Sequence, residues 1–256
     1  MSENRQKDGR MPLRILGITL ARGGSQSVPQ KNIRAVLGTP LIAYTIAEAK
    51  LSQYLSRYIV STDSQEIREV ALEYGAEVPF LRPKHLASNE ASSVAALVHA
   101  VDWLEKSEGR RYDYIVELMC TNPMKTANDI DAVIEKLTGT GADSVISVCR
   151  VEDHHPARIK KIVNDQIVEF CVPEDPESRR QDLKPDAYVR NGAIYALRRD
   201  VLMEQRRRYG TIDSRPYVMP TERSVNVDTL VDLAVSEILL RRYPRPSPQA
   251  SSQREP

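Results

Sequence analysis

The chain has 256 residues, 41% of them apolar, and its 36 basic residues nearly balance 35 acidic ones. A net charge of +1 argues against a nucleic-acid binder that depends on a phosphate-neutralising surface, although it allows a local basic pocket. No apolar run reaches the roughly 20 residues that span a bilayer, and the polar N-terminus lacks an apolar signal core. We therefore expect a cytoplasmic protein with neither a nucleic-acid nor a membrane partner.

Apolar runs typical of strands alternate along the chain with periodic runs typical of helices. Strands are expected at 14–20, 58–62, 113–120 and 144–151, and helices at 40–54, 64–75, 92–107, 127–138 and 229–242. The strand runs are apolar throughout, as in parallel sheets covered on both faces. This alternation predicts an α/β fold with an open, doubly wound, mostly parallel sheet.

Residues 152–190 interrupt this rhythm. The run 159–170, IKKIVNDQIVEF, alternates around Asn164 and Asp165 and predicts a β-hairpin, and a stretch rich in charge and proline follows it. We expect 152–190 to form a projecting arm inserted into one domain at 14–243. Composition predicts disorder for the N-terminal segment 1–13 and the tail 244–256.

The segment ARGGSQSVPQKN, residues 21–32, follows the first expected strand. Ligands of open α/β sheets bind beyond the carboxyl ends of the strands. Gly23 and Gly24 let the backbone approach a ligand with its N–H groups pointing inward, and Arg22 and Lys31 add positive charge, which suits a polyphosphate. The two common phosphate-loop patterns are missing, so an ordinary βα turn with incidental charge stays open.

The same segment resembles the signature loop of the acylneuraminate cytidylyltransferases, the CMP-sialic acid synthetases, usually close to ARGGSKGIPRKN. Further blocks match in order over about 14–243: GTPLIAYTIAEA, STDSQEI, YGAEVPFLRP, LMCTNPMKT (usually LQPTSPLRT), RRQDLKP, YVRNGAIYAL and SVNVDTLVDL. The resemblance implies a Rossmann-like nucleotidyltransferase that transfers CMP from CTP to the anomeric hydroxyl of a nonulosonic (2-keto) sugar acid, releasing pyrophosphate. It also implies a divalent cofactor, usually Mg²⁺, and a homodimer formed through the arm.

The resemblance assigns nucleotide binding to Ala21, Arg22, Gly23, Gly24, Ser25, Lys31, Asn32, Arg82 and Ser92. Arg22, Lys31 and Asp228 would be the catalytic residues. Two of these positions have plainer readings, because Lys31 alone would be a surface lysine and Ser92 is a good N-cap for the helix at 92–107.

On the sugar side the resemblance points to Cys120, Thr121, Asn122, Arg180, Gln181, Asn191 and Tyr195. The forked guanidinium of Arg180 suits a carboxylate, and it would act in the partner's site if the arm crosses to a second subunit. Arg180 also fits an ordinary charged flap, and Tyr195 fits a plain core position.

The metal candidates are Asp228 and Asn226. Read alone, Asp228 is an N-cap, and Asp232 would support the site or only the helix. Asn226 stands where the family has the first of two aspartates, so Mg²⁺ affinity should fall unless substrate phosphates supply most ligands. Two further departures are Gln26, where lysine is usual, and Cys120, where a hydrogen-bonding glutamine is expected.

These departures leave alternatives open. The acceptor could be another nonulosonate, such as a legionaminic or pseudaminic acid-like sugar. The base could be other than cytosine, guanine for example, because a fold does not settle base choice. A non-catalytic nucleotide-binding protein would also suit the change at Asn226.

Overall fold

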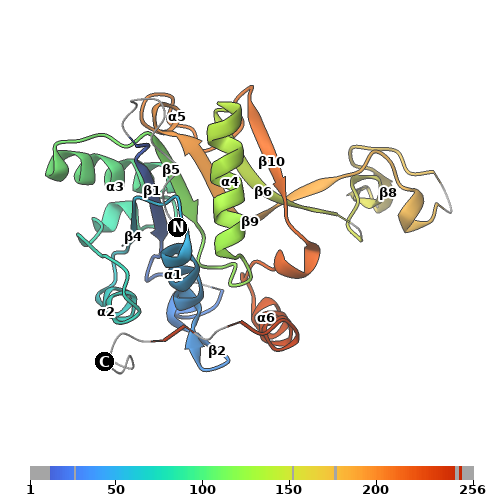
Figure 1. Ribbon diagram of the computed structural model, residues 1–256. Coiled ribbons are helices and arrows are strands. Elements are labelled where there is room, and N and C mark those ends of the chain that lie inside the picture. The colour runs from blue at the N-terminus through green and yellow to red at the C-terminus, as the bar shows by residue number, and fades with distance from the viewer. Residues whose placement is uncertain (1–11, 26, 152, 176–177, 246–247, 250–256) are drawn as a thin grey trace.

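A computed structural model describes residues 12–25, 27–151, 153–175, 178–245 and 248–249. In this part of the chain, six strands form the main sheet in the order β10-β6-β9-β5-β1-β4 (Figure 1). Their bounds are β1 Ile15–Leu20, β4 Arg57–Ser61, β5 Tyr114–Leu118, β6 Ser144–Arg150, β9 Tyr188–Arg198 and β10 Ser214–Val218. Expectations for residues 1–11, Gln26, 246–247 and 250–256 lie outside the described residues.

Helices cover both faces of this sheet (Figure 1). On one face pack α1 (Leu41–Leu51), α2 (Gln65–Glu73) and α4 (Ala127–Thr140), and on the other α3 (Ser93–Glu108) and α5 (Arg199–Met203). Neighbouring strand residues pack into the cores on opposite faces of the sheet. Val60 packs with the first group of helices and Ile59 with the second. Such burial on both faces explains why the strand runs are apolar throughout.

The strand order reverses direction at β1. This strand pairs in parallel with β4 on one side and with β5 on the other. The chain therefore leaves β1 toward β4 and later returns to the opposite side, which opens a crevice beyond the carboxyl end of β1. The helices α2 and α3 begin on this side of the sheet. The Ser64 side chain caps α2, and the Ser92 side chain caps α3.

The predicted fold class is confirmed: the sheet is open, doubly wound and mostly parallel. The four expected strands and five expected helices appear with shifted ends. One strand, β9, runs antiparallel to both of its neighbours. The edge strand β10 was not foreseen, because SRPYV is half-exposed and carries Pro216, which edge strands tolerate.

Several smaller elements complete the chain. A tight hairpin joins β2 (Ala35–Val36) to β3 (Thr39–Pro40), and α6 (Leu230–Arg242) is the last helix. Short 3-10 helices are η1 Lys31–Ile33, η2 Lys84–Leu86, η3 Pro156–Arg158, η4 Arg180–Asp182 and η5 Thr221–Arg223. None of the described helices has the length and apolar character needed to cross a bilayer.

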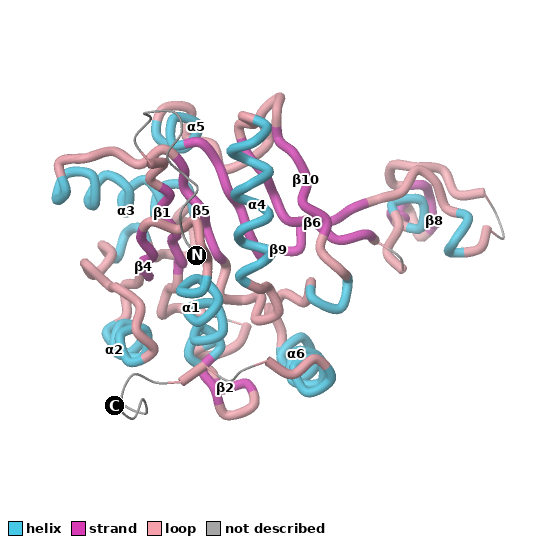
Figure 2. The backbone as a smooth tube through the Cα atoms, viewed as in Figure 1, coloured by secondary structure: helices cyan, strands magenta, loops and turns pink. Residues whose placement is uncertain are grey.

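The arm leaves the body where the paired ends of β6 and β9 meet (Figure 2). Its hairpin, β7 (Lys160–Val163) and β8 (Gln166–Glu169), is the predicted one, with Asn164 and Asp165 both at positive φ in the turn. Positive φ at two central residues is what a two-residue hairpin turn needs. Ile162 faces Ile167 across the hairpin, and each is 77% exposed.

The first residues after α6 contact the body of the protein. Arg245 belongs to the tail expected to begin at 244, yet its guanidinium bonds to backbone carbonyls at Pro123, Met124 and Lys125. Composition does not reveal these contacts, because they join Arg245 to a segment about 120 residues earlier in the chain.

Candidate active site

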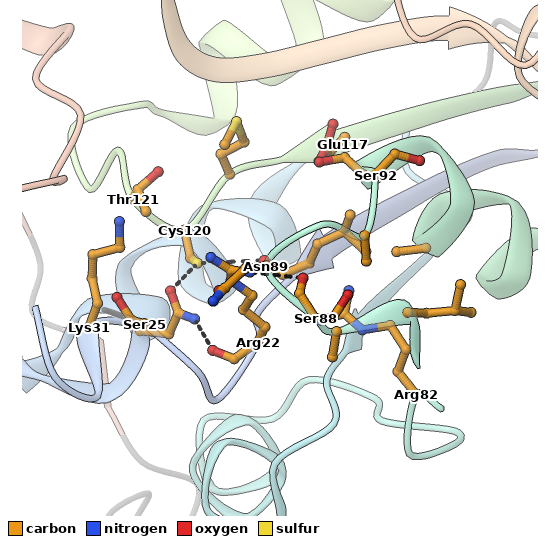
Figure 3. A pocket seen from close by; sticks show the side chains of 18 of the residues that line it. Arg22, Ser25, Lys31, Arg82, Ser88, Asn89, Ser92, Glu117, Cys120 and Thr121 are labelled. Atoms are coloured by element: carbon orange, nitrogen blue, oxygen red, sulfur yellow. Dashed lines mark hydrogen bonds between the residues drawn. The ribbon is translucent and has the colours of Figure 1, made fainter. Parts of the chain in front are cut away.

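A pocket of 520 Å³ opens at the carboxyl end of β1, in the crevice where the strand order reverses. Three segments enclose it: the loop after β1, the stretch from Arg82 to the start of α3, and the end of β5 with the loop that follows. Predicted site residues that line it are Arg22, Ser25, Lys31, Asn32, Arg82, Ser92, Cys120, Thr121 and Asp228. Figure 3 shows Lys31 and Thr121 at one end and Arg82 at the other, with Arg22 between them.

The glycine loop contributes less backbone than its sequence suggests. The amide of Gly23 donates to Asp63 Oδ1 at 3.0 Å, and the amide of Ser25 donates to Gly23 O at 3.1 Å. Among the amides of Gly23, Gly24 and Ser25, only that of Gly24 lacks a hydrogen-bond partner among the described residues. The expectation of several inward-pointing N–H groups therefore needs correction. Ala21 is fully buried and continues the sheet through a bond to Ser61 O.

Gly23 has a steric reason to be glycine. A Cβ built there would lie 3.0 Å from Ser64 Cβ, at the cap of α2, whereas a Cβ at Gly24 would meet nothing within 4 Å. The close approach places the loop against the second helix, so this glycine serves packing. Gly24 leaves space open beside the pocket.

Positive charge dominates the pocket. Arg22 donates to Ser88 O at 3.0 Å, which lays its guanidinium across the cavity. Arg82 is only 5% exposed, and its nearest anionic partner, Asp63 Oδ1, is 3.9 Å away. Its buried Nε has no partner in the described part of the chain. Burial lowers the pKa of Arg82, Asp63 opposes this, and the nearby charge of Arg22 lowers the pKa further. An anionic ligand would relieve this unfavourable environment.

A chain of hydrogen bonds crosses the far end of the pocket. Lys31 Nζ lies 2.8 Å from Asp228 Oδ1, and Asn226 Nδ2 donates to Asp228 Oδ2 at 2.5 Å. Thr121 Oγ1 donates to Asn226 Oδ1 at 2.6 Å. Asn226 is thus joined to the pocket through Asp228, although it does not line the cavity.

The backbone around this chain is also constrained. Val227 N donates to Thr121 O at 2.7 Å, which ties the segment before α6 to the loop after β5. Gly192 has φ +63°, and a Cβ there would lie 3.1 Å from Asn226 Oδ1. Asp232 accepts from the amide of Thr229 and completes a capping box, so it supports the helix start.

The metal candidates offer few ligands. Among the described residues no group of three or more His, Cys, Asp or Glu side chains is placed to hold a metal ion. Asp228 supplies one carboxylate, 63% exposed, and Asn226 one amide oxygen. Mg²⁺ is commonly bound by one or two carboxylates together with substrate phosphates, so this pair fits a Mg²⁺ ion that arrives with a nucleotide.

Cys120 acts within the protein as a hydrogen-bond donor. Its Sγ donates to Asn32 Oδ1 at 3.1 Å, and Asn32 Nδ2 donates to Arg22 O at 2.9 Å. Burial raises the pKa of the Cys120 thiol to about 11, which keeps it protonated. Asn32 therefore links the loop after β1 to the loop after β5.

The departure assigned to Cys120 belongs to Met119. Laid without gaps over LMCTNPMKT, the block LQPTSPLRT places its glutamine opposite Met119 and its first proline opposite Cys120. Met119 also lines the pocket. A thioether accepts hydrogen bonds only weakly, so this wall is less polar than a glutamine would make it.

Asn122 has a supporting position. It is fully buried, and its Oδ1 accepts from the amides of Met124 and Lys125 while its Nδ2 donates to Arg223 O. The structure does not place it on the pocket wall. Lys125 is buried beneath the same turn, with Nζ 2.6–2.7 Å from Thr45 Oγ1, Met119 O and Asn122 O.

Four other candidates lie apart from the pocket. Arg180 and Gln181 line a separate hollow of 240 Å³ at the base of the arm, where Arg180 pairs with Asp153 at 3.1 Å. Asn191, 4% exposed, joins Ser147 Oγ to Ser224 Oγ where β6 and β9 shift register. Tyr195, also 4% exposed, is a core residue that packs against the guanidinium of Arg208 at 4.2 Å.

Glu117 is a pocket residue that the sequence analysis missed. It is 2% exposed on β5 and pairs with Arg208, Nη1 to Oε2 at 2.7 Å. Burial raises the pKa of Glu117, while Arg208 opposes that rise. A single charge inside the apolar run YIVELMC was the available signal, because buried acids need a partner.

A cationic pocket at the reversal point of an open, mostly parallel sheet is the arrangement of a nucleotide-binding α/β protein. The family model described as Cytidylyltransferase matches residues 16–229, and the chain belongs to this family.

Relatives support this assignment. The chain is 34% identical to the pseudaminic acid cytidylyltransferase of Campylobacter jejuni, over 90% of this chain and 97% of that protein. It is 29% identical to the CMP-N,N'-diacetyllegionaminic acid synthase of Legionella pneumophila, over 89% of this chain and 97% of the relative. The solved structure of CMP:2-keto-3-deoxy-manno-octonic acid synthetase complexed with CTP superposes with a TM-score of 0.67 at 16% identity, covering 90% and 99% of the two chains. At this low identity, the similarity to the solved structure shows only that the two proteins share a fold.

The buried Lys125 makes stability depend on pH. Burial lowers the pKa of Lys125 to about 7, so between about pH 7 and 10 the unfolded chain binds more protons at this side chain than the folded chain. Its contribution to the free energy of unfolding therefore rises with pH across this window. We expect the free energy of unfolding of the wild type, minus that of Lys125→Met, to rise by up to about 1.4 kcal/mol per pH unit across this window. Denaturant unfolding of both proteins at several pH values measures this quantity.

The exposed Lys106 supplies the matched control, because Lys106→Met removes an ammonium that is 75% exposed. Its difference from wild type should stay nearly constant with pH. A Lys125→Met difference that is equally flat would contradict the lowered pKa.

Proposed function

We propose that this chain transfers CMP from CTP to the anomeric hydroxyl of a nonulosonic sugar acid and releases pyrophosphate. The observation that carries the proposal is the pocket beyond β1, where Arg22, Lys31 and Arg82 gather at the reversal point of the sheet. The named relatives act on pseudaminic and legionaminic acids, which are sugar acids of this class.

The charges of the pocket suit a triphosphate. Arg22 spans the middle of the cavity, and Lys31 stands at the end opposite Arg82. Of the two acids on the wall, Glu117 is neutralised by Arg208 and Asp228 is bonded to Lys31. Arg22 and Lys31 would stabilise charge that builds up on the phosphates as the α-phosphorus is attacked.

The nucleoside end would lie near α3. Ser92 lines the pocket there while its side chain also accepts from Ala95 N, so its capping role and a ligand role are compatible. Arg82 enters from the neighbouring segment with a buried Nε that lacks a partner among the described residues. A polar base or ribose atom is the kind of group that would satisfy this donor.

The acceptor end would lie near Thr121. A bond would form between the anomeric oxygen of the sugar acid and the α-phosphorus, the bond to the pyrophosphate oxygen would break, and the hydroxyl proton would be released. Thr121 would orient this acceptor, and Met119 would offer it an apolar wall. Positioning supplies much of the rate in such an in-line transfer.

Asp228 and Asn226 would hold the divalent cofactor, Mg²⁺, together with phosphate oxygens of the substrate. When bound, such an ion stabilises negative charge on the phosphates. Both oxygens of Asp228 accept hydrogen bonds, from Lys31 and from Asn226. Lys31 would shift to the triphosphate when the nucleotide enters, which frees one carboxylate oxygen.

A second copy of the chain would complete the sugar side. Arg180 and Gln181 lie in the arm and do not line the pocket of their own chain, so they would meet a sugar acid only in the pocket of a partner. The arm exposes Ile162, Ile167 and Phe170, at 77%, 77% and 60%. Exposed apolar groups of this kind mark an interaction surface, and we propose that they form a homodimer interface.

Pyrophosphate release tests the reaction. With Mg²⁺, each of the four nucleoside triphosphates and a panel of nonulosonic acids, we expect turnover with CTP and one or a few acceptors. Arg22→Ala and Lys31→Ala should each lower kcat/KM by about 100-fold or more, because each removes a cation from the developing charge. Arg34→Ala, at an exposed arginine beside the loop, is the control and should stay near wild type.

Two results would redirect the proposal. Turnover with GTP alone would assign the enzyme another base. Tight nucleotide binding without pyrophosphate release from any acceptor would point to a non-catalytic nucleotide-binding protein.

The substitution Asn226→Asp tests the metal site. It replaces the donor to Asp228 with a second carboxylate, so the variant should melt at a lower temperature without metal and should bind Mg²⁺ roughly tenfold more tightly in the absence of nucleotide. Thermal unfolding at increasing Mg²⁺ concentration measures both effects. Asn164→Asp, the same change in the arm turn, is the control, and equal Mg²⁺ responses in the two variants would remove Asn226 from the site.

Light scattering at micromolar concentration tests the dimer. We expect a dimer for the wild type and a monomer for Ile162→Glu combined with Ile167→Glu, since charge on the exposed hairpin face would have to be buried in the interface. Ile212→Glu, at a fully exposed isoleucine of the body, should leave the dimer intact. A monomeric wild type would refute the interface.

A further inference from the structure

The loop that follows β5, residues 119–125, is held from several sides, and most of its carbonyl oxygens accept hydrogen bonds from elsewhere in the chain. Lys125 Nζ donates from the interior to Met119 O and Asn122 O, each within 2.7 Å. Thr121 O accepts from Val227 N at 2.7 Å. The remaining turn, 123–125, presents three consecutive carbonyls that these interior donors do not reach.

Arg245 occupies this outer position. Its Nη1 donates to Lys125 O at 2.6 Å and to Pro123 O at 3.4 Å, and its Nη2 donates to Met124 O. The guanidinium fork can serve several oxygens at once because its N–H groups diverge in one plane. Few other side chains could place donors on three neighbouring carbonyls.

The guanidinium is itself fixed. The Arg245 side chain is 13% exposed and lies 3.5 Å from Glu48 Oε1. Glu48 Oε2 accepts from the amide of Ala127, at the start of α4, at 2.7 Å. Glu48 thus orients Arg245 and anchors the same turn from its other end.

These contacts are not needed to end helix α6. The helix closes at Tyr243, whose amide bonds to Leu239 O, and Arg245 comes two residues later. Its hydrogen bonds reach a segment about 120 residues earlier in the chain. The consequence of losing them would therefore fall on the loop rather than on the helix.

The loop that Arg245 supports carries the acceptor end of the pocket. Met119, Cys120 and Thr121 line the cavity from this loop, and Thr121 bonds to Asn226 in the chain that leads to Asp228. The nucleoside end, by contrast, is built from Arg82 and the start of α3, which Arg245 does not touch.

We propose that Arg245 is a positioning residue for the acceptor sugar acid: by capping the carbonyls of 123–125 it holds Thr121 and Met119 in the geometry that receives the acceptor. This inference rests on the proposed function for the identity of the acceptor. It makes the segment beyond α6 part of the machinery of the pocket.

The test uses full-length protein in three variants. Arg245→Ala removes the donors, and Arg245→Lys keeps a cation beside Glu48 while removing the planar fork. Arg242→Ala is the matched control, an exposed arginine in the last turn of α6. Steady-state kinetics give separate KM values for CTP and for the sugar acid, and hydrogen exchange reports the loop 119–126 and α3 independently of turnover.

We expect Arg245→Ala to lower kcat/KM for the sugar acid by at least about tenfold, with the KM for CTP changed by less than about threefold. Amide exchange should speed up in 119–126 and not in α3. Arg245→Lys should fall between wild type and Arg245→Ala, and Arg242→Ala should match the wild type in every readout.

Wild-type exchange in 119–126 of Arg245→Ala would overturn the inference, and so would KM values for CTP and sugar acid that rise together. Exchange that speeds up equally in α3 would show general destabilisation and would also overturn it. An absence of turnover in the wild type would refute the proposed function, whereas exchange confined to 119–126 would still support the positioning role of Arg245.

Discussion

The pocket depends on one ion pair, Lys31 with Asp228, and on the hydrogen bonds that extend it through Asn226 to Thr121. These residues come from three segments that the sheet brings to one edge: the loop after β1, the loop after β5 and the segment before α6. The chain of bonds holds the three segments in register. It also keeps the Lys31 ammonium in the pocket, paired with the Asp228 carboxylate, which is largely exposed to water.

The pocket holds more positive charge than its own carboxylates balance. Glu117 is buried but fully paired with Arg208, and Cys120 stays a neutral thiol, so neither balances the remaining cations. Arg82 bears the highest cost, because it is buried with an unpartnered Nε and its closest carboxylate is 3.9 Å away. A ligand that offers a hydrogen-bond acceptor to this Nε would offset the cost and so contribute to affinity.

Much of the fold could be predicted because its signals are local. The strands are continuous apolar runs, and the helices begin at recognisable caps such as Ser64 and Ser92. The candidate residues of the first loop are also local, since Arg22, Lys31 and Asn32 lie within eleven positions and all reach the pocket. The direction of β9 has no local signal, because pairing partners decide whether a strand runs parallel or antiparallel.

The rest of the site depends on long-range packing. Glu117 meets Arg208 from 91 positions away, and Arg245 reaches the loop after β5 from about 120. The spacing of residues along the sequence does not predict contacts between positions so far apart. The amide of Gly23 is another example, since its acceptor Asp63 lies in the loop after the neighbouring strand β4, 40 positions later in the chain. Asn191 and Asn122 were plausible ligands by residue type, yet their side chains are occupied by internal bonds that only the folded chain reveals.

A crystal structure of the protein with CTP and Mg²⁺ would show whether the cationic pocket beyond β1 binds the triphosphate. We expect a triphosphate within hydrogen-bond distance of Arg22 and Lys31, with Lys31 Nζ moved away from Asp228 and the ion beside the freed carboxylate. A nucleotide bound elsewhere, or a triphosphate in this pocket beside an unbroken Lys31–Asp228 pair, would contradict it.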